Sequence, residues 1–169
     1  MKKVLIAVDD TKGSQSVLSV FHNLVRPPEE VLLLHVERLE GRSMMIDMLS
    51  DSEITTLKEQ LQGTEYKEAL DKKAEKILSH YRRELEDGGL INVRPIIREG
   101  IPSDEILKVA EAENVDLIIV GSNEKRGFDR LVSGCVSKDV EKHSGVPVII
   151  GKYNGEEKAL AVDTATTTI

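Results

Sequence analysis

The sequence predicts an α/β protein built on a single doubly wound, five-stranded parallel sheet with helices on both faces. Five short runs rich in Val, Ile and Leu alternate with longer segments in which apolar residues recur at helical spacing. This alternation is typical of parallel sheets with helical crossovers, and uniformly apolar strands indicate burial on both faces. The predicted strands are residues 4–8, 31–36, 93–97, 116–120 and 146–150.

Helical segments connect these strands. The first carries Val17 and Phe21 at helical spacing and stops before Pro27, because the residue before a proline disfavours helical geometry. The longest, residues 66–85, ends at a glycine pair, which is a common helix terminator. A third follows the turn at 100–103, where Ser103 is the predicted N-cap, and a fourth covers residues 136–143.

Length and composition indicate one domain. The chain has 169 residues, of which 40% are hydrophobic and 31% charged, and this balance supports a core and argues against wholesale disorder. We assign residues 1–151 to the domain. The remainder, 152–169, is polar and rich in Thr, so we predict a disordered or frayed tail.

Residues 37–63 interrupt the regular alternation. Their length exceeds the usual strand-to-helix connection, and their apolar positions have only partial helical periodicity. We predict a mobile excursion with one or two short helices that faces a protein partner. Its residues Met44, Met45 and Met48 form either an adaptable docking surface or the cover of an apolar patch on their own domain.

Charge, cysteine and histidine content exclude several classes. The net charge is −7 and the basic residues are interleaved with acidic ones, so we predict no nucleic-acid surface. The first apolar run is too short for a signal peptide or a membrane span, and one cysteine cannot form an internal disulfide. We therefore expect a cytoplasmic protein. The four histidines have no metal-ligand spacing, and no acid–base pair or nucleophile elbow is evident, so we predict neither a metal site nor catalytic residues.

The ends of the predicted strands locate the expected binding site. In doubly wound sheets, ligands bind at the carboxyl ends of the strands, near the point where strand order reverses. Here those ends carry Asp9 with Asp10, the residues after His35, the segment 98–100, and Gly121 with Ser122.

Several motifs, in order along the chain, resemble the universal stress protein family. They are VLIAVD at 4–9, GIP at 100–102, NVDLIIVGS at 114–122, GF at 127–128, LVSGCVS at 131–137 and VPVII at 146–150. The resemblance covers residues 1 to about 151. It implies a five-stranded Rossmann-like fold, stress-linked expression in the cytoplasm and dimerisation.

Many members of that family bind ATP through Gly-x-x-Gly, nine residues, then Gly-Ser or Gly-Thr. Glycines let backbone N–H groups approach phosphate oxygens, and a following helix N-terminus favours the anion. In this chain Gly121 and Gly134 match, whereas Glu124 replaces the second glycine and Cys135 the hydroxyl residue. The resemblance implies candidate nucleotide-binding residues Asp9, Val36, Gly121, Ser122, Gly127, Gly134, Cys135, Val136 and Ser137, with Mg²⁺ accompanying any bound ATP.

Each of these residues also has a structural explanation. The glycines suit a tight turn and close helix packing. Asp9 either contacts a ribose, as the resemblance implies, or caps the first helix. Cys135 is either a reactive thiol at a helix start or a small buried residue. Two functions follow: a protein with a degenerate ATP-binding loop that acts through dimerisation and partner binding, or one that senses or carries adenine nucleotide.

The last predicted strand supplies the expected dimer interface. The family's strand order places it at an edge of the sheet, and it is apolar and uncharged, so it invites pairing with a second copy. The predicted interface residues are Val146, Val148, Ile149 and Ile150.

Overall fold

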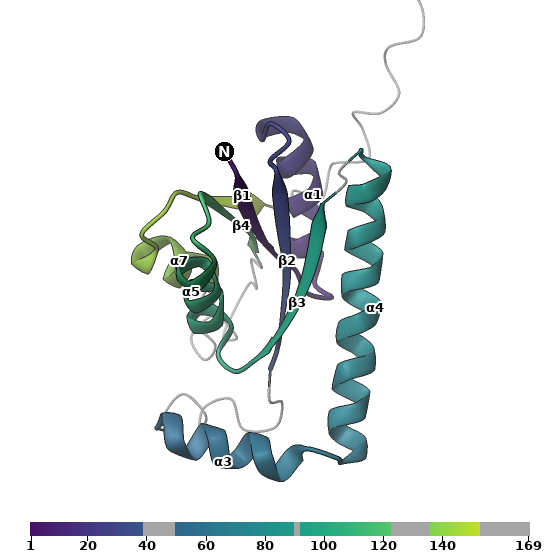
Figure 1. Cartoon of the computed structure of the whole chain (residues 1–169), viewed down its shortest axis with the longest axis vertical. Helices are drawn as coiled ribbons and strands as arrows, with labels where there is room; N and C mark the ends of the chain where they lie inside the picture. The colour runs from purple at the N-terminus through teal and green to yellow at the C-terminus, as the bar shows by residue number, and fades with distance from the viewer. Residues whose placement is uncertain (39–49, 90–91, 123–135, 153–169) are drawn as a thin grey trace, which may run out of the picture.

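The predicted fold class is confirmed by the computed structural model, which describes residues 1–38, 50–89, 92–122 and 136–152. Five parallel strands form one sheet in the order β3-β2-β1-β4-β5 (Figure 1). The strands are β1 (Lys3–Ala7), β2 (Glu30–Glu37), β3 (Val93–Glu99), β4 (Leu117–Ser122) and β5 (Val148–Lys152).

Helices cover both faces of this sheet. The described helices are α1 (Lys12–Leu24), α3 (Asp51–Leu61), α4 (Glu65–Asp87), α5 (Pro102–Glu113) and α7 (Val136–His143), of which α3 lies beyond the end of the sheet. Helices α1 and α4 lie on one face, whereas α5 and α7 lie on the other (Figure 1). The chain moves from β1 to β3 in one direction and returns past β1 to β4 and β5, so the order reverses between β1 and β4. That reversal is where binding sites of doubly wound sheets lie.

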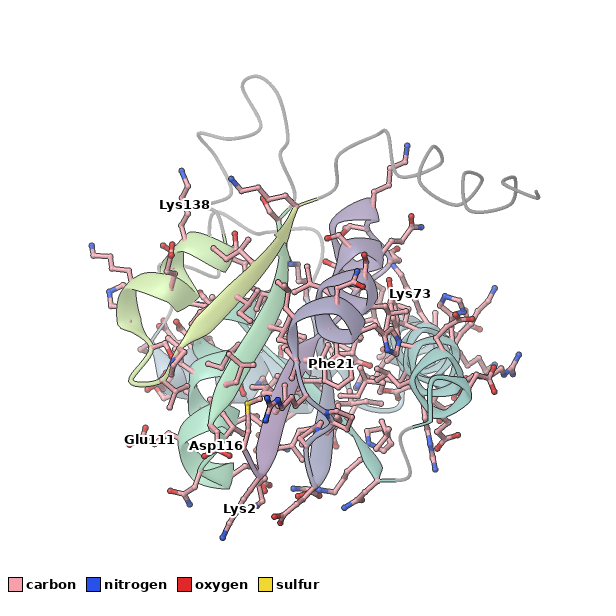
Figure 2. The ribbon with its side chains drawn as sticks, turned by 90° about the horizontal axis from the view of Figure 1, so that it is seen from above. Lys2, Phe21, Lys73, Glu111, Asp116 and Lys138 are labelled. Atoms are coloured by element: carbon pink, nitrogen blue, oxygen red, sulfur yellow. The ribbon has the colours of Figure 1, made fainter. Side chains whose placement is uncertain are left out.

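Successive residues of a strand point to opposite faces of the sheet and so belong to two separate apolar layers. Val4 and Ile6 of β1 pack beneath α1 and α4, whereas Leu5 packs beneath α5, and none of the three is exposed. Figure 2 shows Phe21 of α1 directed into the first layer, while Lys138 of α7 points outward. The central strands are apolar on both faces because both faces are covered.

The last strand begins later than predicted. Val146 precedes β5, since the Ser144 hydroxyl accepts from the Val146 N–H (3.1 Å) and donates to its C=O (2.7 Å). The strand instead continues through Gly151 to Lys152, which moves the start of the predicted tail from 152 to 153. Residues 153–169 lie outside the described part of the chain.

The predicted N-cap of the third long helix is wrong. Helix α5 begins at Pro102, its N-cap residue is Ile101, and no side chain caps it. Proline suits the first helical position because its missing N–H would have no partner there in any case. Ser103 is therefore the second residue of the helix.

The excursion contains one described helix, α3, as the periodicity predicted. The helix starts with a capping box in which Ser50 and Glu53 exchange side-chain to backbone hydrogen bonds, and none of its residues is buried. Residues 39–49, with Met44, Met45 and Met48, lie outside the described residues. Mobility and partner contact of this segment remain predictions. None of the described helices combines the length and apolar character that a bilayer span requires.

The two edges of the sheet differ in chemistry. Strand β3 carries Pro95 and three charged residues, Arg94, Arg98 and Glu99. The Gly100 N–H donates to the Glu37 C=O (3.1 Å), so even-numbered residues of β3 face β2 and the missing N–H of Pro95 lies on the outer edge. Strand β5 has no proline, and Lys152 is its only charged residue.

Candidate functional site

Gly121 lies at the reversal point and is in close contact with the start of α1. A Cβ atom at this position would come within 2.3 Å of the Gly13 carbonyl oxygen and 2.8 Å of the Ser14 nitrogen. Neither neighbour is a flexible side chain, so only glycine fits. This contact supports the packing explanation for Gly121 and fixes the end of β4 against the start of α1.

Asp9 organises the loop between β1 and α1. Its Oδ1 accepts hydrogen bonds from the Thr11 N–H (2.8 Å), the Thr11 hydroxyl and the Ser14 hydroxyl (2.7 Å). The Asp9 N–H in turn donates to the Ser14 Oγ (2.9 Å). Thr11 is the N-cap residue of α1 and makes no side-chain cap of its own. Asp9 therefore holds together the residues at the start of the helix, although Thr11 is the N-cap residue, and contact of Asp9 with a ribose stays a prediction.

Val36 carries backbone groups on the open side of the site. Strand β2 extends past the end of β1, and the Val8 N–H makes the last ladder bond, to the Leu34 C=O (2.9 Å). Because residues of a parallel strand alternate in the neighbour they bond, Val36 faces β1 as Leu34 does. No described residue accepts from the Val36 N–H. Its N–H and C=O thus point into the space beyond β1, a donor and acceptor side by side.

The adjacent α4 face supplies a further ion pair and a buried phenol. Lys73 lies 2.8 Å from Asp10, and its hydrogen bond lowers the pKa of that carboxyl. Burial raises the pKa of Tyr81 to about 12, with the Asp9 and Asp10 charges adding to the effect. Tyr81 is therefore neutral beside the site at physiological pH.

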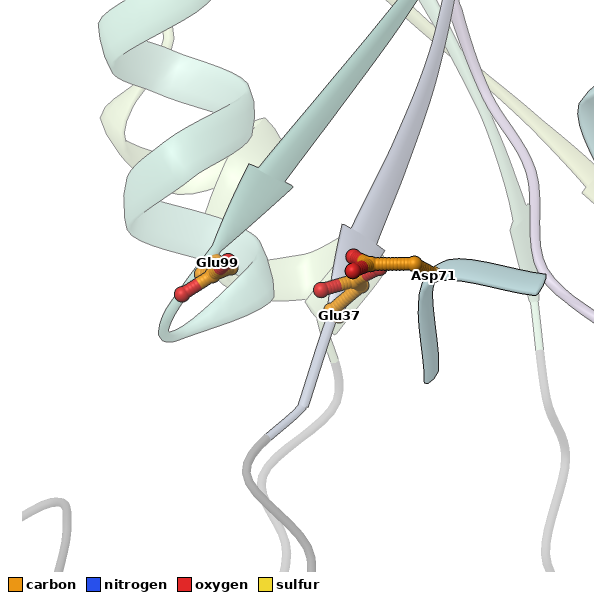
Figure 3. Close-up of side chains that lie close together, drawn as sticks. All are labelled: Glu37, Asp71 and Glu99. Atoms are coloured by element: carbon orange, nitrogen blue, oxygen red, sulfur yellow. The ribbon is translucent and has the colours of Figure 1, made fainter. Parts of the chain in front are cut away.

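A second group of charges lies where β2 and β3 end; we call it the Lys67 cluster. The Lys67 Nζ on α4 lies 2.6 Å from Glu37 Oε2, 2.6 Å from Glu99 Oε1 and 2.5 Å from Asp71 Oδ1. Figure 3 shows the three carboxylates converging from β2, the end of β3 and α4. One ammonium group therefore joins a helix to two strands.

The Lys67 cluster holds three carboxylates against one ammonium. The Glu37 side chain is only 1% exposed, and its Oε1 is buried with no hydrogen-bond partner among the described residues. Burial raises the pKa of Glu37, although the Lys67 hydrogen bond opposes that effect. Ligand atoms of Glu37, Asp71 and Glu99 lie within 4.8 Å of one another, as in a metal site. Lys67 already fills the space between them, so the geometry favours an ion-paired cluster over a metal site.

The structure places some of the predicted site residues and not others. Asp9, Gly121 and Ser122 lie at the carboxyl ends of β1 and β4, and Val36 lies beyond β1. Val136 and Ser137 are the first two residues of α7, and Ser137 is buried. Glu124, Gly127, Gly134 and Cys135 lie outside the described residues.

The Lys67 cluster was missed by the sequence reasoning. A signal existed, because Glu37 directly follows one predicted strand and Glu99 lies two residues past the end of another, and both strands end at the same edge of the sheet. The contribution of Lys67 and Asp71 had no local signal, since it depends on where α4 packs.

Comparison with known proteins identifies the family. The model of the universal stress protein family matches residues 1–152. Universal stress protein MJ0577 of Methanocaldococcus jannaschii is 34% identical over 157 residues, which cover 89% of this chain and 94% of that protein. Universal stress protein YxiE of Bacillus subtilis is 30% identical over 149 residues, covering 88% of this chain and 97% of that protein.

Solved structures agree with this assignment. The structure of MJ0577 is 32% identical and superposes with a TM-score of 0.66, covering 90% of this chain and 96% of that chain. A family protein from Arabidopsis thaliana is 21% identical with a TM-score of 0.62, covering 95% and 97%, and shares the fold. The chain belongs to the universal stress protein family.

Proposed function

We propose that this chain is a cytoplasmic, adenine-nucleotide-binding universal stress protein that binds adenosine well and phosphates poorly. The observation that carries the proposal is the N–H and C=O of Val36, which have no backbone partner among the described residues and point into the space beyond β1, beside the reversal point. Adenine presents a matching pair, because its ring N1 accepts and its exocyclic amine donates. Among solved proteins of this fold, the Arabidopsis structure has AMP bound and another is in complex with cAMP.

The expected weakness for phosphates comes from Glu124. This residue stands where ATP-binding relatives have a glycine, so it adds both a Cβ and a negative charge to the loop. Two like charges about 4 Å apart repel by about 4 kcal/mol at an effective dielectric of 20. We therefore expect the protein to discriminate little between adenosine and ATP.

Isothermal titration of adenosine and of Mg-ATP tests this proposal. The native chain is expected to bind both with similar affinity, and Glu124→Gly to strengthen ATP binding by about tenfold or more while leaving adenosine unchanged. Glu124→Gln is the matched control, because it removes the charge and keeps the side chain. ATP binding by the native chain that is much tighter than its adenosine binding would contradict the role of Glu124, and absence of adenosine binding would contradict the whole proposal.

We propose that the protein acts as a homodimer whose two copies pair through β5. Among the described strands, β5 pairs only with β4, and its other side is unpaired. Val148, Ile149 and Ile150 are each only partly buried there, and an apolar unpaired edge favours pairing.

The mass in solution tests the dimer. Val148→Lys is expected to give a folded monomer by light scattering. Ile97→Lys on the opposite edge, where Ile97 is 36% exposed, is the control and is expected to leave the mass unchanged. A native monomer, or a Val148→Lys dimer, would count against pairing through β5.

A further inference from the structure

We propose that His35 is a positioning residue that keeps the backbone of Val36 free for a base; this rests on the proposed adenosine site. His35 lies on β2 directly before Val36, is only 7% exposed, and its Nδ1 lies 2.9 Å from the Val8 carbonyl oxygen. A carbonyl oxygen can only accept, so Nδ1 carries the proton and donates.

If the ladder between β1 and β2 continued by one more bond, the Val8 carbonyl would accept that bond from the Val36 N–H. In the register of β1 and β2, Ala7 pairs with Leu34, and the Val8 N–H donates to the Leu34 C=O. One step further along a parallel ladder, the next bond joins the Val36 N–H to the Val8 C=O. That bond is not among the backbone hydrogen bonds of the described residues.

His35 therefore takes the place of a backbone donor at the end of the ladder. The Val8 carbonyl keeps a hydrogen bond, as a group at the end of a buried strand requires, and the Val36 N–H is released. Since the C=O of Val36 lies on the same side of β2, the release leaves a donor and an acceptor together. The pair matches the N1 acceptor and amino donor of adenine and opposes hypoxanthine, whose N1–H donates and whose O6 accepts.

Two substitutions separate this role from general stability. His35→Asn keeps a donor near the position of Nδ1, whereas His35→Leu removes it. In His35→Leu the Val8 carbonyl becomes available to the Val36 N–H, so adenosine must compete with the ladder. We expect adenosine affinity to fall about five- to tenfold, the range for one net hydrogen bond, and to be restored in large part by His35→Asn. Binding of inosine is expected to change little, so the preference for adenosine over inosine narrows.

A measurement without ligand tests whether the His35 ring and the Val36 N–H compete for the Val8 carbonyl. Hydrogen exchange of the Val36 amide, followed by NMR, is expected to be fast in the native protein and in His35→Asn, and slower in His35→Leu. If the native protein binds no adenosine but the Val36 amide still slows in His35→Leu, the adenosine site is wrong and the role of His35 in the ladder stands. If His35→Leu leaves both the exchange rate and the adenosine–inosine preference unchanged, the inference is overturned.

Discussion

The two ends of the sheet are held by charge networks of opposite character. At the amino end, Arg94 bonds Glu30 (2.9 Å) and Glu113 (2.6 Å), and Lys3 lies 3.8 Å from both carboxylates; we call this the Arg94 network. It balances two cations against two anions, and the Arg94 side chain is 42% exposed. The Lys67 cluster at the carboxyl end sets one cation, 13% exposed, against three anions.

The two networks therefore differ in how strongly the stability of the fold depends on each charged residue. Solvated, balanced ion pairs stabilise little and tolerate change. A cluster with excess negative charge around a buried carboxylate depends on its single cation, because Glu37 loses hydration whether or not it is paired. In the Lys67 cluster, at the end of the sheet that bears the proposed site, charge compensation therefore depends on Lys67 alone among the described residues. In the Arg94 network at the amino end it is shared by Arg94 and Lys3.

The largest expected effect is that of Lys67→Met. Removing the ammonium leaves three carboxylates facing one another, and breaking a buried ion pair in this way typically costs about 3–5 kcal/mol. Urea unfolding at pH 7 measures the loss. Lys73→Met is the matched control on the same helix, because Lys73 pairs with Asp10 at an exposed position, and it is expected to lose less than about 1 kcal/mol. Equal losses in the two variants would show that the Lys67 cluster is no more demanding than a surface pair.

Acid is expected to lessen the defect of Lys67→Met. The pKa of Glu37 in the native protein lies above its ordinary value of 4.5 because the side chain is buried, and loss of Lys67 raises it further. Between the unfolded and folded pKa values the folded state binds more protons, so the free energy of unfolding rises as pH falls through that window. The deficit of Lys67→Met is therefore expected to shrink between pH 7 and pH 5. A deficit that stays constant or grows in acid contradicts this assignment.

Glu37→Gln is expected to change stability far less, by about 1 kcal/mol or less at pH 7. The substitution removes one of the three negative charges and leaves Lys67 paired with Asp71 and Glu99. It also removes the carboxyl whose pKa burial raises, so stability should become less dependent on pH between 5 and 7. Chemical unfolding at both pH values checks this, and an unaltered pH dependence would assign the titration to another group.

A similarly small effect is expected for Arg94→Ala in the Arg94 network. Exposed ion pairs contribute about 0.2–1 kcal/mol each, and salt screens them. The loss in unfolding free energy is therefore expected to be near 1 kcal/mol at low salt and smaller in 0.5 M NaCl. The deficit of Lys67→Met should vary little with salt, and a reversed salt dependence would undo the comparison between the two ends.

Local patterns in the sequence predicted the strands and the long helices, whereas the edge position of the last strand followed from the resemblance to the family. They did so because the apolar runs and glycine or proline stops that define these elements are contained within short windows. The site was only partly predictable. That Gly121 packs on Gly13, and that the His35 ring takes the Val8 carbonyl, depends on how α1, β2 and β4 meet in space. The charged residues of the Lys67 cluster are far apart in sequence, and only the packing of α4 brings them together.

The β5 and β3 edges of the sheet differ in how readily each can pair with another copy of the chain. A surface that pairs with its own copy across a two-fold axis is used up in doing so, whereas a surface that pairs with a different patch can repeat without end. Pro95 removes a donor from the outer side of β3, and the strand also carries Arg94, Arg98 and Glu99, so the far edge offers a poor template for pairing. In the dimer proposed above, the β5 edge is occupied by the partner copy, and the β3 edge that remains exposed is the one least suited to adding a further copy.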